Sequence, residues 1–287
     1  MNSKRTYVDY DKDRTFTSGV EQADETEIKR LLEVGKFKCA YATKRIVSGN
    51  QVELEIYPEF TRKDMNLDDS IKKKSSKAQK NLNDKNARKR LRRLLNTNFS
   101  NDDIWATLTY EDRSLPSDMK SSQKDMSNYI KRLNYQRKKL GLPPAKYIYV
   151  TEYSEGKKKI RCHHHLIISG DMSMDLVEKV WKKGRRNNTR RIKKSVDGLN
   201  GLAEYISKDP KGKKRWCSSK NLEQPKVYKN HRDFSMKKIR EMIRNKNMIR
   251  QFVEARYPGM IYLDEQALYN TYNGRTYFYI QLAIPDT

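Results

Sequence analysis

The sequence predicts an α+β fold, and three observations support this class. From residue 104 onward, segments with strand and helix patterns follow in the order β-α-β-β-α-β, with one more helix behind them. Hydrophobic residues make up 36% of the 287 residues, which is enough to bury a core. This order is that of the split β-α-β, ferredoxin-like or RRM-like arrangement, an antiparallel sheet with helices on one face. We expect the other face to be free to bind a ligand.

Two segments precede this core. Residues 36–57 predict a β-hairpin, because β-rich alternating stretches flank a Ser-Gly-Asn turn at residues 48–50. Residues 58–70 contain a proline and several acidic residues and predict a linker.

Residues 71–95 hold 11 basic residues and one acidic residue. Leu91, Leu94 and Leu95 give the end of this stretch the apolar edge of a helix. A solvated linker helix is one interpretation. A helix that lies on phosphates is the interpretation we favour, because a basic face repels itself without a counter-charge.

The core begins with a strand over residues 104–110 and a helix over 118–140, which Gly141 and the prolines behind it should end. A strand over 146–153 and another over 160–168 follow, joined by a short turn. The helix has a predicted apolar edge, formed by Met126, Tyr129, Ile130, Leu133 and Leu140.

The second half of the core continues with a short helix over residues 172–183 and a strand near 190–196. Asp197 is then the expected N-cap of a helix over 198–208, which stops before Pro210.

The C-terminal part has a mostly helical pattern over residues 220–260 and then a β-hairpin around Asn273 and Gly274. We expect this part to pack on the core domain. The chain is thus divided into four predicted segments: an accessory segment 1–70, a basic helix or linker 71–97, a core domain 98–222, and C-terminal helices and hairpin 223–287.

Positive charge is concentrated in one part of the chain. The formal net charge is +26, yet residues 1–70 carry 12 basic and 14 acidic residues, a net charge of −2. The other 217 residues therefore carry +28. A surplus of this size exceeds what solubility needs and indicates a polyanionic partner, for which nucleic acid is the first candidate.

The cellular compartment is inferred from what the sequence lacks. No apolar run approaches the roughly 20 residues of a membrane helix, and no apolar segment follows the N-terminal charges. The three cysteines, Cys39, Cys162 and Cys217, are scattered and odd in number, so they predict no disulfide framework. We expect a cytoplasmic protein that does not contact a membrane.

Three consecutive histidines lie in the predicted strand 160–168. Side chains alternate along a strand, so His163 and His165 share one face and His164 points away. Glu152 on the preceding strand should lie opposite this pair or diagonal to it. Two imidazoles and one carboxylate suit a divalent ion such as Mn²⁺ or Mg²⁺ and leave positions for substrate oxygens.

Blander interpretations of the same residues remain. A histidine in a strand is often only structural, and a zinc site with Cys162 or Cys217 is a further alternative, although no CxxC motif is present. Glu155 is a weaker ligand candidate because it lies in the turn.

Tyr205 lies in the predicted helix 198–208, outside the apolar stripe. That stripe repeats at helical spacing and consists of Leu199, Leu202, Ala203 and Ile206. Tyr205 is not needed for the apolar face, and Lys208 follows on its side one turn later. A tyrosine beside a metal-bound phosphate can act as a nucleophile once its proton is removed. The alternative is a boundary tyrosine beside a solvated lysine.

The order WATLTY (105–110), HHHLII (163–168) and EYISK (204–208) resembles the three motifs of the HUH endonuclease superfamily. In this order the chain is similar to single-tyrosine rolling-circle replication initiators (Rep) of plasmids and phages, and to replication-associated proteins of Gram-positive mobile elements. The phrases KYIYVTEYS, LNYQRKKLGLPP and PKGKKRWCSSKNL strengthen the resemblance, which covers residues 96–222. His164 departs from the family pattern, whose middle position is usually hydrophobic.

The resemblance implies the role of each residue. His163, His165 and Glu152 would bind the divalent metal, Tyr205 would attack the DNA, and Lys208 would support it as a cation. The product would be a 5′-phosphotyrosine bond with a free 3′-hydroxyl that primes synthesis, and the reaction could be reversed to rejoin the strand. Further residues are expected to hold DNA: Thr107, Thr109, Arg92, Arg93, Arg185, Arg186, Arg190 and Arg191.

The implied partners are single-stranded origin DNA, in linear or hairpin form, and a host helicase and polymerase of a bacterial cell. No Walker A motif is present, so unwinding would fall to the host helicase. A second copy of the chain is a further candidate partner.

Three alternatives remain for the function. A relaxase shares the chemistry but usually carries its tyrosine ahead of the histidine motif, whereas Tyr205 follows it here. An HUH transposase keeps the present order. A non-catalytic RNA- or DNA-binding module would use the same sheet architecture, with aromatic residues on its central strands.

Overall fold

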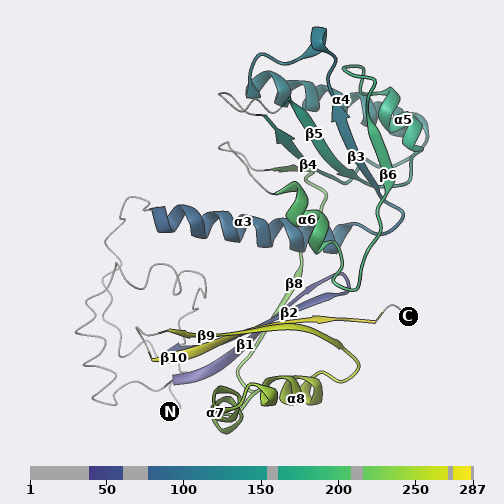
Figure 1. Cartoon of the computed structure of the whole chain (residues 1–287). Helices are drawn as coiled ribbons and strands as arrows, with labels where there is room; N and C mark the ends of the chain where they lie inside the picture. Colours follow the sequence, from purple (N-terminus) through teal and green to yellow (C-terminus); the bar gives the residue numbers. More distant parts are fainter. Residues whose placement is uncertain (1–38, 61–76, 154–160, 208–215, 271–273, 286–287) are drawn as a thin grey trace, which may run out of the picture. The chain divides into compact units, whose positions relative to one another are not determined.

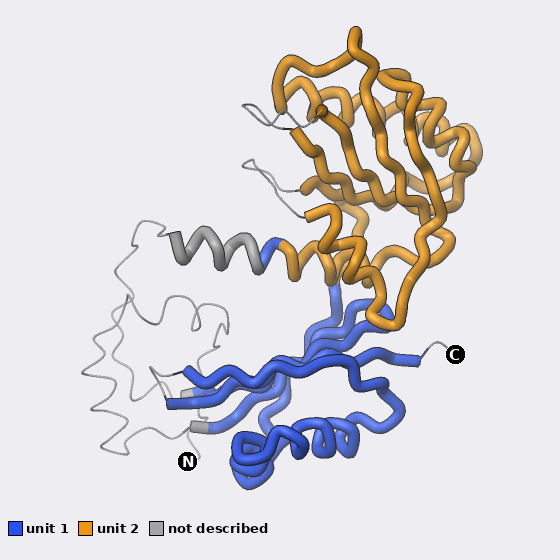
Figure 2. Tube along the Cα trace, viewed as in Figure 1, with its two compact units in different colours: residues 1–87, 225–287 blue, residues 88–224 orange. Residues whose placement is uncertain are grey.

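The computed structural model describes residues 39–60, 77–153, 161–207, 216–270 and 274–285 (Figure 1). The chain forms two compact units (Figure 2). Unit 1 comprises residues 1–87 and 225–287, and unit 2 comprises residues 88–224. The four segments predicted from the sequence stay a prediction.

Unit 2 contains the predicted β-α-β-β-α-β core. Its elements are β3 (Ile104–Thr109), the 3-10 turn η2 (Asp112–Ser114), α4 (Met119–Lys139), β4 (Tyr147–Glu152), β5 (His163–Ile168), α5 (Met174–Lys179), β6 (Asn188–Arg191) and β7 (Cys217–Ser218). The strand order is β6-β3-β5-β4-β7, and each neighbouring pair is antiparallel. This is the strand order of the split β-α-β arrangement, so the predicted fold class is confirmed.

Helices α4 and α5 cover one face of this sheet. Asp118 caps α4 by accepting a hydrogen bond from the Ser121 backbone N–H at 2.6 Å, and Gly141, with φ of 71°, follows its end. The predicted apolar edge of α4 is buried except for Leu140, which is 58% exposed because it lies past the last helical turn. The core on this face also contains Trp181 and the inward residues of β3 and β5.

The other face of the sheet is also partly covered, which differs from the expectation of a free face. Helix α3 (Lys77–Asn98) and helix α6 (Asn200–Ile206) pack there against strand residues such as Ile148 and Ile167 (Figure 1). Leu91, Leu94 and Leu95, the predicted apolar edge of α3, are buried in this second core. The helices leave uncovered the part of the face that carries the histidine pair.

The N-terminus of α6 differs from the prediction. Asp197 is not its cap, because its carboxylate accepts a hydrogen bond from the Ser195 hydroxyl instead. Asn96 of α3 takes that role: its side-chain oxygen accepts from the Leu199 N–H at 2.7 Å, and its amide donates to the Asn200 side chain at 3.2 Å. A partner distant in sequence therefore fixes the helix that carries Tyr205.

Two other elements are shorter than predicted. Helix α5 begins after Ser173, whose hydroxyl accepts from the Leu176 N–H, and it ends at Lys179. Lys182 has a φ of 61°, which no continuing helix allows. A Cβ at Gly184 would lie 2.2 Å from the Thr109 carbonyl oxygen, so this close passage of the chain requires glycine. Strand β6 ends at Arg191, not at the predicted 196.

Unit 1 joins the two hairpins that the sequence predicts at opposite ends of the chain. Its elements are β1 (Cys39–Ser48), β2 (Gln51–Phe60), β8 (Lys226–Asn230), α7 (Met236–Arg244), α8 (Asn247–Arg256), β9 (Ile261–Asn270) and β10 (Arg275–Ala283). They form one antiparallel sheet of order β8-β1-β2-β10-β9. Helices α7 and α8 pack on this sheet.

The helical pattern predicted over residues 220–260 is wrong at both ends. Residues 226–230 form strand β8, which pairs with β1, and residues 261–270 form β9, which is longer than the hairpin strand we expected. The β8 sequence KVYKN is mostly exposed and basic, so it lacks an apolar period that would reveal a strand. No helix in the described ranges has the length and apolar character needed to cross a bilayer.

Candidate active site

The strand register places the predicted metal ligands on one face of the unit 2 sheet. Glu152 of β4 pairs directly with His163 of β5, and Val150 pairs with His165. Alternation then puts Glu152, His163 and His165 on the face opposite the α4–α5 core. The predicted geometry, a carboxylate opposite one histidine and diagonal to the other, is confirmed.

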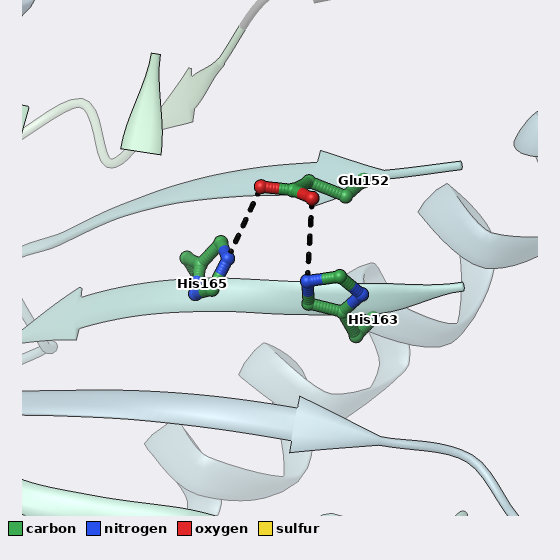
Figure 3. Close-up of side chains that lie close together, drawn as sticks. All are labelled: Glu152, His163 and His165. Atoms are coloured by element: carbon green, nitrogen blue, oxygen red, sulfur yellow. Dashed lines mark ion pairs between the residues drawn. The ribbon is translucent and has the colours of Figure 1, made fainter. Parts of the chain in front are cut away.

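The three side chains converge on one point (Figure 3). The Nε2 atom of His163 lies 3.4 Å from one Glu152 oxygen, and Nε2 of His165 lies 3.3 Å from the other. One ligand atom from each residue lies within 4.8 Å of the other two. His165 is 3% exposed, whereas His163 and Glu152 retain 23% and 30% side-chain exposure, so the group is open to solvent on one side.

Hydrogen bonds to the second ring nitrogens set the orientation of both imidazoles. His163 Nδ1 lies 2.9 Å from the Arg161 carbonyl oxygen, which can only accept, so Nδ1 carries the proton and Nε2 offers its lone pair. His165 Nδ1 lies 3.3 Å from the Thr107 hydroxyl. Metal-ligating histidines are typically held in this way by outer-shell partners. Thr107 is thus placed as a support for His165.

This donor set fits a divalent ion. Burial lowers the pKa of His165 below its ordinary value, and the charge of His163 acts in the same direction, so the imidazole is neutral and able to coordinate. Two imidazole nitrogens and a carboxylate leave coordination positions free, as catalytic metal sites require. Among the described residues, the group contains no cysteine; Cys162 and Cys217 lie with the core on the opposite face, which argues against the zinc alternative.

His164 has a different environment from its two neighbours. It is fully buried, and its ring nitrogens lie 2.8 Å from the Tyr110 hydroxyl and 2.9 Å from the Thr151 hydroxyl. Its ring also contacts Trp181. Burial lowers the pKa of His164 to about 3, with a smaller contribution from the adjacent histidines. His164 is therefore a neutral, satisfied core residue.

Tyr205 lies beside the metal group on helix α6. Its ring centroid is 5.3 Å from that of His165 and 5.4 Å from that of Trp105. The side chain is 43% exposed, while Ala203 and Ile206 of the same helix are buried. The apolar stripe thus anchors the helix and leaves the tyrosine at the surface. Lys208 lies outside the described residues.

The remaining predicted DNA-binding residues have several different roles. The Thr109 hydroxyl donates to the Arg186 carbonyl at 2.7 Å and ties β3 to the loop before β6. Arg185 is exposed and pairs with Glu111 at 3.3 Å. Arg191 donates to the carbonyls of Asp102 and Gly170, so its guanidinium stabilises loops.

Arg190 differs from these arginines because its guanidinium stacks on Trp105, 3.8 Å from the ring centroid. Arg92 and Arg93 lie on α3 with partly exposed side chains, and a DNA contact for them stays a prediction. Three residues of this region were missed in the sequence, namely Trp105, Asn96 and Arg161. Only Trp105 had a signal, because it alternates onto the same face as Thr107.

The comparison with protein families follows this geometry. Residues 103–210 match the family described as Replication-associated protein ORF2. The matched segment includes the metal group and the helix with Tyr205. No curated protein and no solved structure matches the chain. Over this segment the chain is similar to replication-associated proteins, and the match supports a protein that initiates replication.

Proposed function

We propose that this protein nicks and rejoins single-stranded DNA with Tyr205 as the nucleophile, and thereby initiates rolling-circle replication. The observation that carries the proposal is the position of the Tyr205 ring, 5.3 Å from that of His165, at the open side of the Glu152–His163–His165 group. The similarity to replication-associated proteins supports the biological role.

Glu152, His163 and His165 hold a divalent ion in this proposal, with Mn²⁺ or Mg²⁺ as the candidates. When bound, the ion supplies Lewis-acid polarisation of the scissile phosphate. Arg161 and Thr107 keep the imidazoles in the tautomer and orientation that coordination needs.

The chemical step is a transesterification. The Tyr205 hydroxyl loses its proton and its oxygen attacks phosphorus, while the bond from phosphorus to the 3′-oxygen breaks. The 3′-oxygen takes up a proton and becomes a free hydroxyl, and the 5′-phosphate stays on the tyrosine. The number of phosphoester bonds is unchanged, so the reverse attack by a 3′-hydroxyl rejoins the strand without ATP. Lys208 is the proposed cation that favours the phenolate.

The free 3′-hydroxyl then primes a host polymerase, and a host helicase unwinds the duplex. Origin DNA in single-stranded or hairpin form is the proposed substrate. Exposed basic residues of unit 2 attract the strand, and binding should weaken steeply with salt.

The test is a covalent-adduct assay with a pool of random-sequence single-stranded oligonucleotides and Mn²⁺, resolved on a denaturing gel. A 3′-labelled pool should give a labelled protein band, and a 5′-labelled pool should not, because the 5′ fragment is released. EDTA and Tyr205→Phe should each abolish the band. An adduct that persists in Tyr205→Phe would refute the assignment of the nucleophile. Binding without any adduct would favour a non-catalytic binding module.

The adduct assay does not separate an initiator from a transposase or relaxase, so the sequences recovered from the adduct supply that test. A single recurrent sequence that also supports replication of a plasmid carrying it indicates an initiator. Cleavage at the ends of a mobile element would indicate a transposase.

A further inference from the structure

A cleft of about 750 Å³ opens beside Tyr205 within unit 2. Strand β3, the segment from β6 onward and helix α6 form its walls. The lining residues that matter here are Trp105, Arg190, Lys193, Leu199, Leu202 and Tyr205. The volume is in the range of about 300–1,000 Å³ that is typical of small-ligand sites.

Trp105 forms the apolar wall of this cleft and has an unmet hydrogen-bonding group. Its indole N–H is buried, and no acceptor for it is present in the described part of the chain. A buried donor without an acceptor is rare in a folded protein and is costly unless a ligand or water completes it. The ring is also covered on one face by the Arg190 guanidinium at 3.8 Å, an arrangement in which a flat cation occupies a stacking surface.

Two cations at this cleft have no carboxylate partner. Within the described ranges, neither Arg190 nor Lys193 forms an ion pair, and both are exposed. Arg191 next to them is occupied by two backbone carbonyls. The cleft thus combines an aromatic and aliphatic wall with two available positive charges.

We propose that this cleft binds one unpaired nucleotide adjacent to the scissile phosphate, with its base stacked on Trp105 and its phosphate held by Arg190 and Lys193. This inference rests on the proposed nicking function and names the substrate contact that positions the strand. The ring centroids of Trp105, His165 and Tyr205 form a triangle with sides of 5.3, 5.4 and 6.5 Å. A strand whose phosphate lies at His165 and Tyr205 therefore brings its next nucleotide to Trp105.

The chemistry of the cleft selects a single strand. A base reaches an aromatic wall only when it is neither paired nor stacked in a duplex. The phosphate contacts carry no sequence information, and stacking tolerates every base. The cleft should therefore fix the position of the strand, while sequence recognition depends on other contacts.

Tryptophan fluorescence tests this with the full chain, in EDTA so that no cleavage occurs, and with a 15-nucleotide oligo(dT) as the probe. We expect oligo(dT) to quench the wild-type emission and Trp105→Phe to remove most of that quenching. Trp105→Ala should lower the affinity by roughly 5- to 100-fold, the range that loss of one stacked base gives. Trp216→Phe is the matched control and should keep the quenching, because Trp216 does not line the cleft.

A charge-matched pair separates a phosphate contact from general attraction. Arg190→Ala should weaken oligo(dT) binding and lower the slope of log affinity against log salt by about 0.7. Arg240→Ala removes the same charge from exposed α7 of unit 1 and should change the affinity less. Equal losses in the two variants, or quenching that survives Trp105→Phe, would overturn the proposal.

The two proposals fail in different ways. If the wild type neither binds oligo(dT) nor forms the covalent adduct, the proposed function fails and this inference fails with it. If the wild type forms the adduct and Trp105→Ala forms it at the same oligonucleotide concentration and binds equally well, only the cleft assignment is wrong.

Discussion

The two faces of strand β5 carry the same residue type in different chemical states. His163 and His165 face the solvent-accessible side, with their Nε2 atoms directed at Glu152. His164 faces the core, where the hydroxyls of Tyr110 and Thr151 occupy both of its ring nitrogens. Adjacent positions in a sequence therefore share no environment in a strand, and the partners of each ring decide what it can do.

The comparison also explains why the face with the pair remains available. On the core face, α4, α5 and Trp181 close the sheet over His164. On the other face, α3 and α6 close only the part near Ile148 and Ile167. The ends of β4 and β5 remain open there, and Tyr205 borders that opening.

The largest expected effect distinguishes the two faces by metal affinity. His163→Ala and His165→Ala should each lower Mn²⁺ affinity by more than about 100-fold, because each removes a ligand and not an outer-shell partner. Their melting temperatures without metal should change little for His163, which is partly exposed. Isothermal titration with Mn²⁺ measures the affinity. Wild-type affinity in both variants would contradict the assignment of this group.

His164→Ala should have the opposite pattern. It leaves a cavity and two buried hydroxyls without a partner, at a cost of about 2–5 kcal/mol in the free energy of unfolding. The folded fraction should still bind Mn²⁺ more tightly than His165→Ala does. Urea unfolding and titration on the same samples give both quantities. A stable His164→Ala that has lost Mn²⁺ binding would reverse the roles of the two faces.

The pH dependence of stability tests the protonation state of His164. Its pKa is about 3 in the fold against 6.5 for an exposed histidine, so between these values the unfolded chain binds a proton that the folded chain does not. Stability is then complete above about pH 6.5 and is lost as the pH falls toward 3. Between pH 7 and pH 5 this one group should contribute about 2 kcal/mol.

Urea unfolding in EDTA at the two pH values measures this difference. His164→Gln retains a polar side chain for the two hydroxyls and should show a smaller loss between pH 7 and pH 5 than the wild type. An identical loss in both proteins would show that other groups determine the pH dependence.

The smallest expected effect concerns the support of His165. Thr107→Val removes the hydroxyl at 3.3 Å from Nδ1 and keeps the shape of the side chain. Loss of such an outer-shell partner should lower Mn²⁺ affinity by about 10-fold, at the low end of the usual range. Thr189→Val is a control on β6, where the hydroxyl bonds to Glu178 and not to a histidine. Equal effects of the two variants would exclude a specific role for Thr107.

Much of unit 2 could be predicted because its signals are local. Period-2 alternation assigns Glu152, His163 and His165 to one face, and a turn too short to allow another pairing sets their register. The same alternation assigns His164 to the core. The position of Tyr205 beside His165 required tertiary structure, because Asn96 of α3 caps the helix that carries it.

Unit 1 could not be predicted to the same extent. The pairing of β2 with β10 joins residues more than 200 positions apart, for example Ile56 with Phe278, and no periodicity reports such a partner. Strand β8 is exposed and lysine-rich, so its local pattern does not predict the strand that β1 imposes on it.

The central claim is that Tyr205 forms the covalent bond to DNA, and peptide mapping of the adduct tests it most directly. Trypsin should release residues 195–208 as one peptide, and Tyr205 is its only tyrosine. After nuclease digestion, mass spectrometry should find the nucleotide mass on this peptide, linked through the 5′-phosphate. A nucleotide on any of the other tyrosines, with residues 195–208 unmodified, would contradict the account.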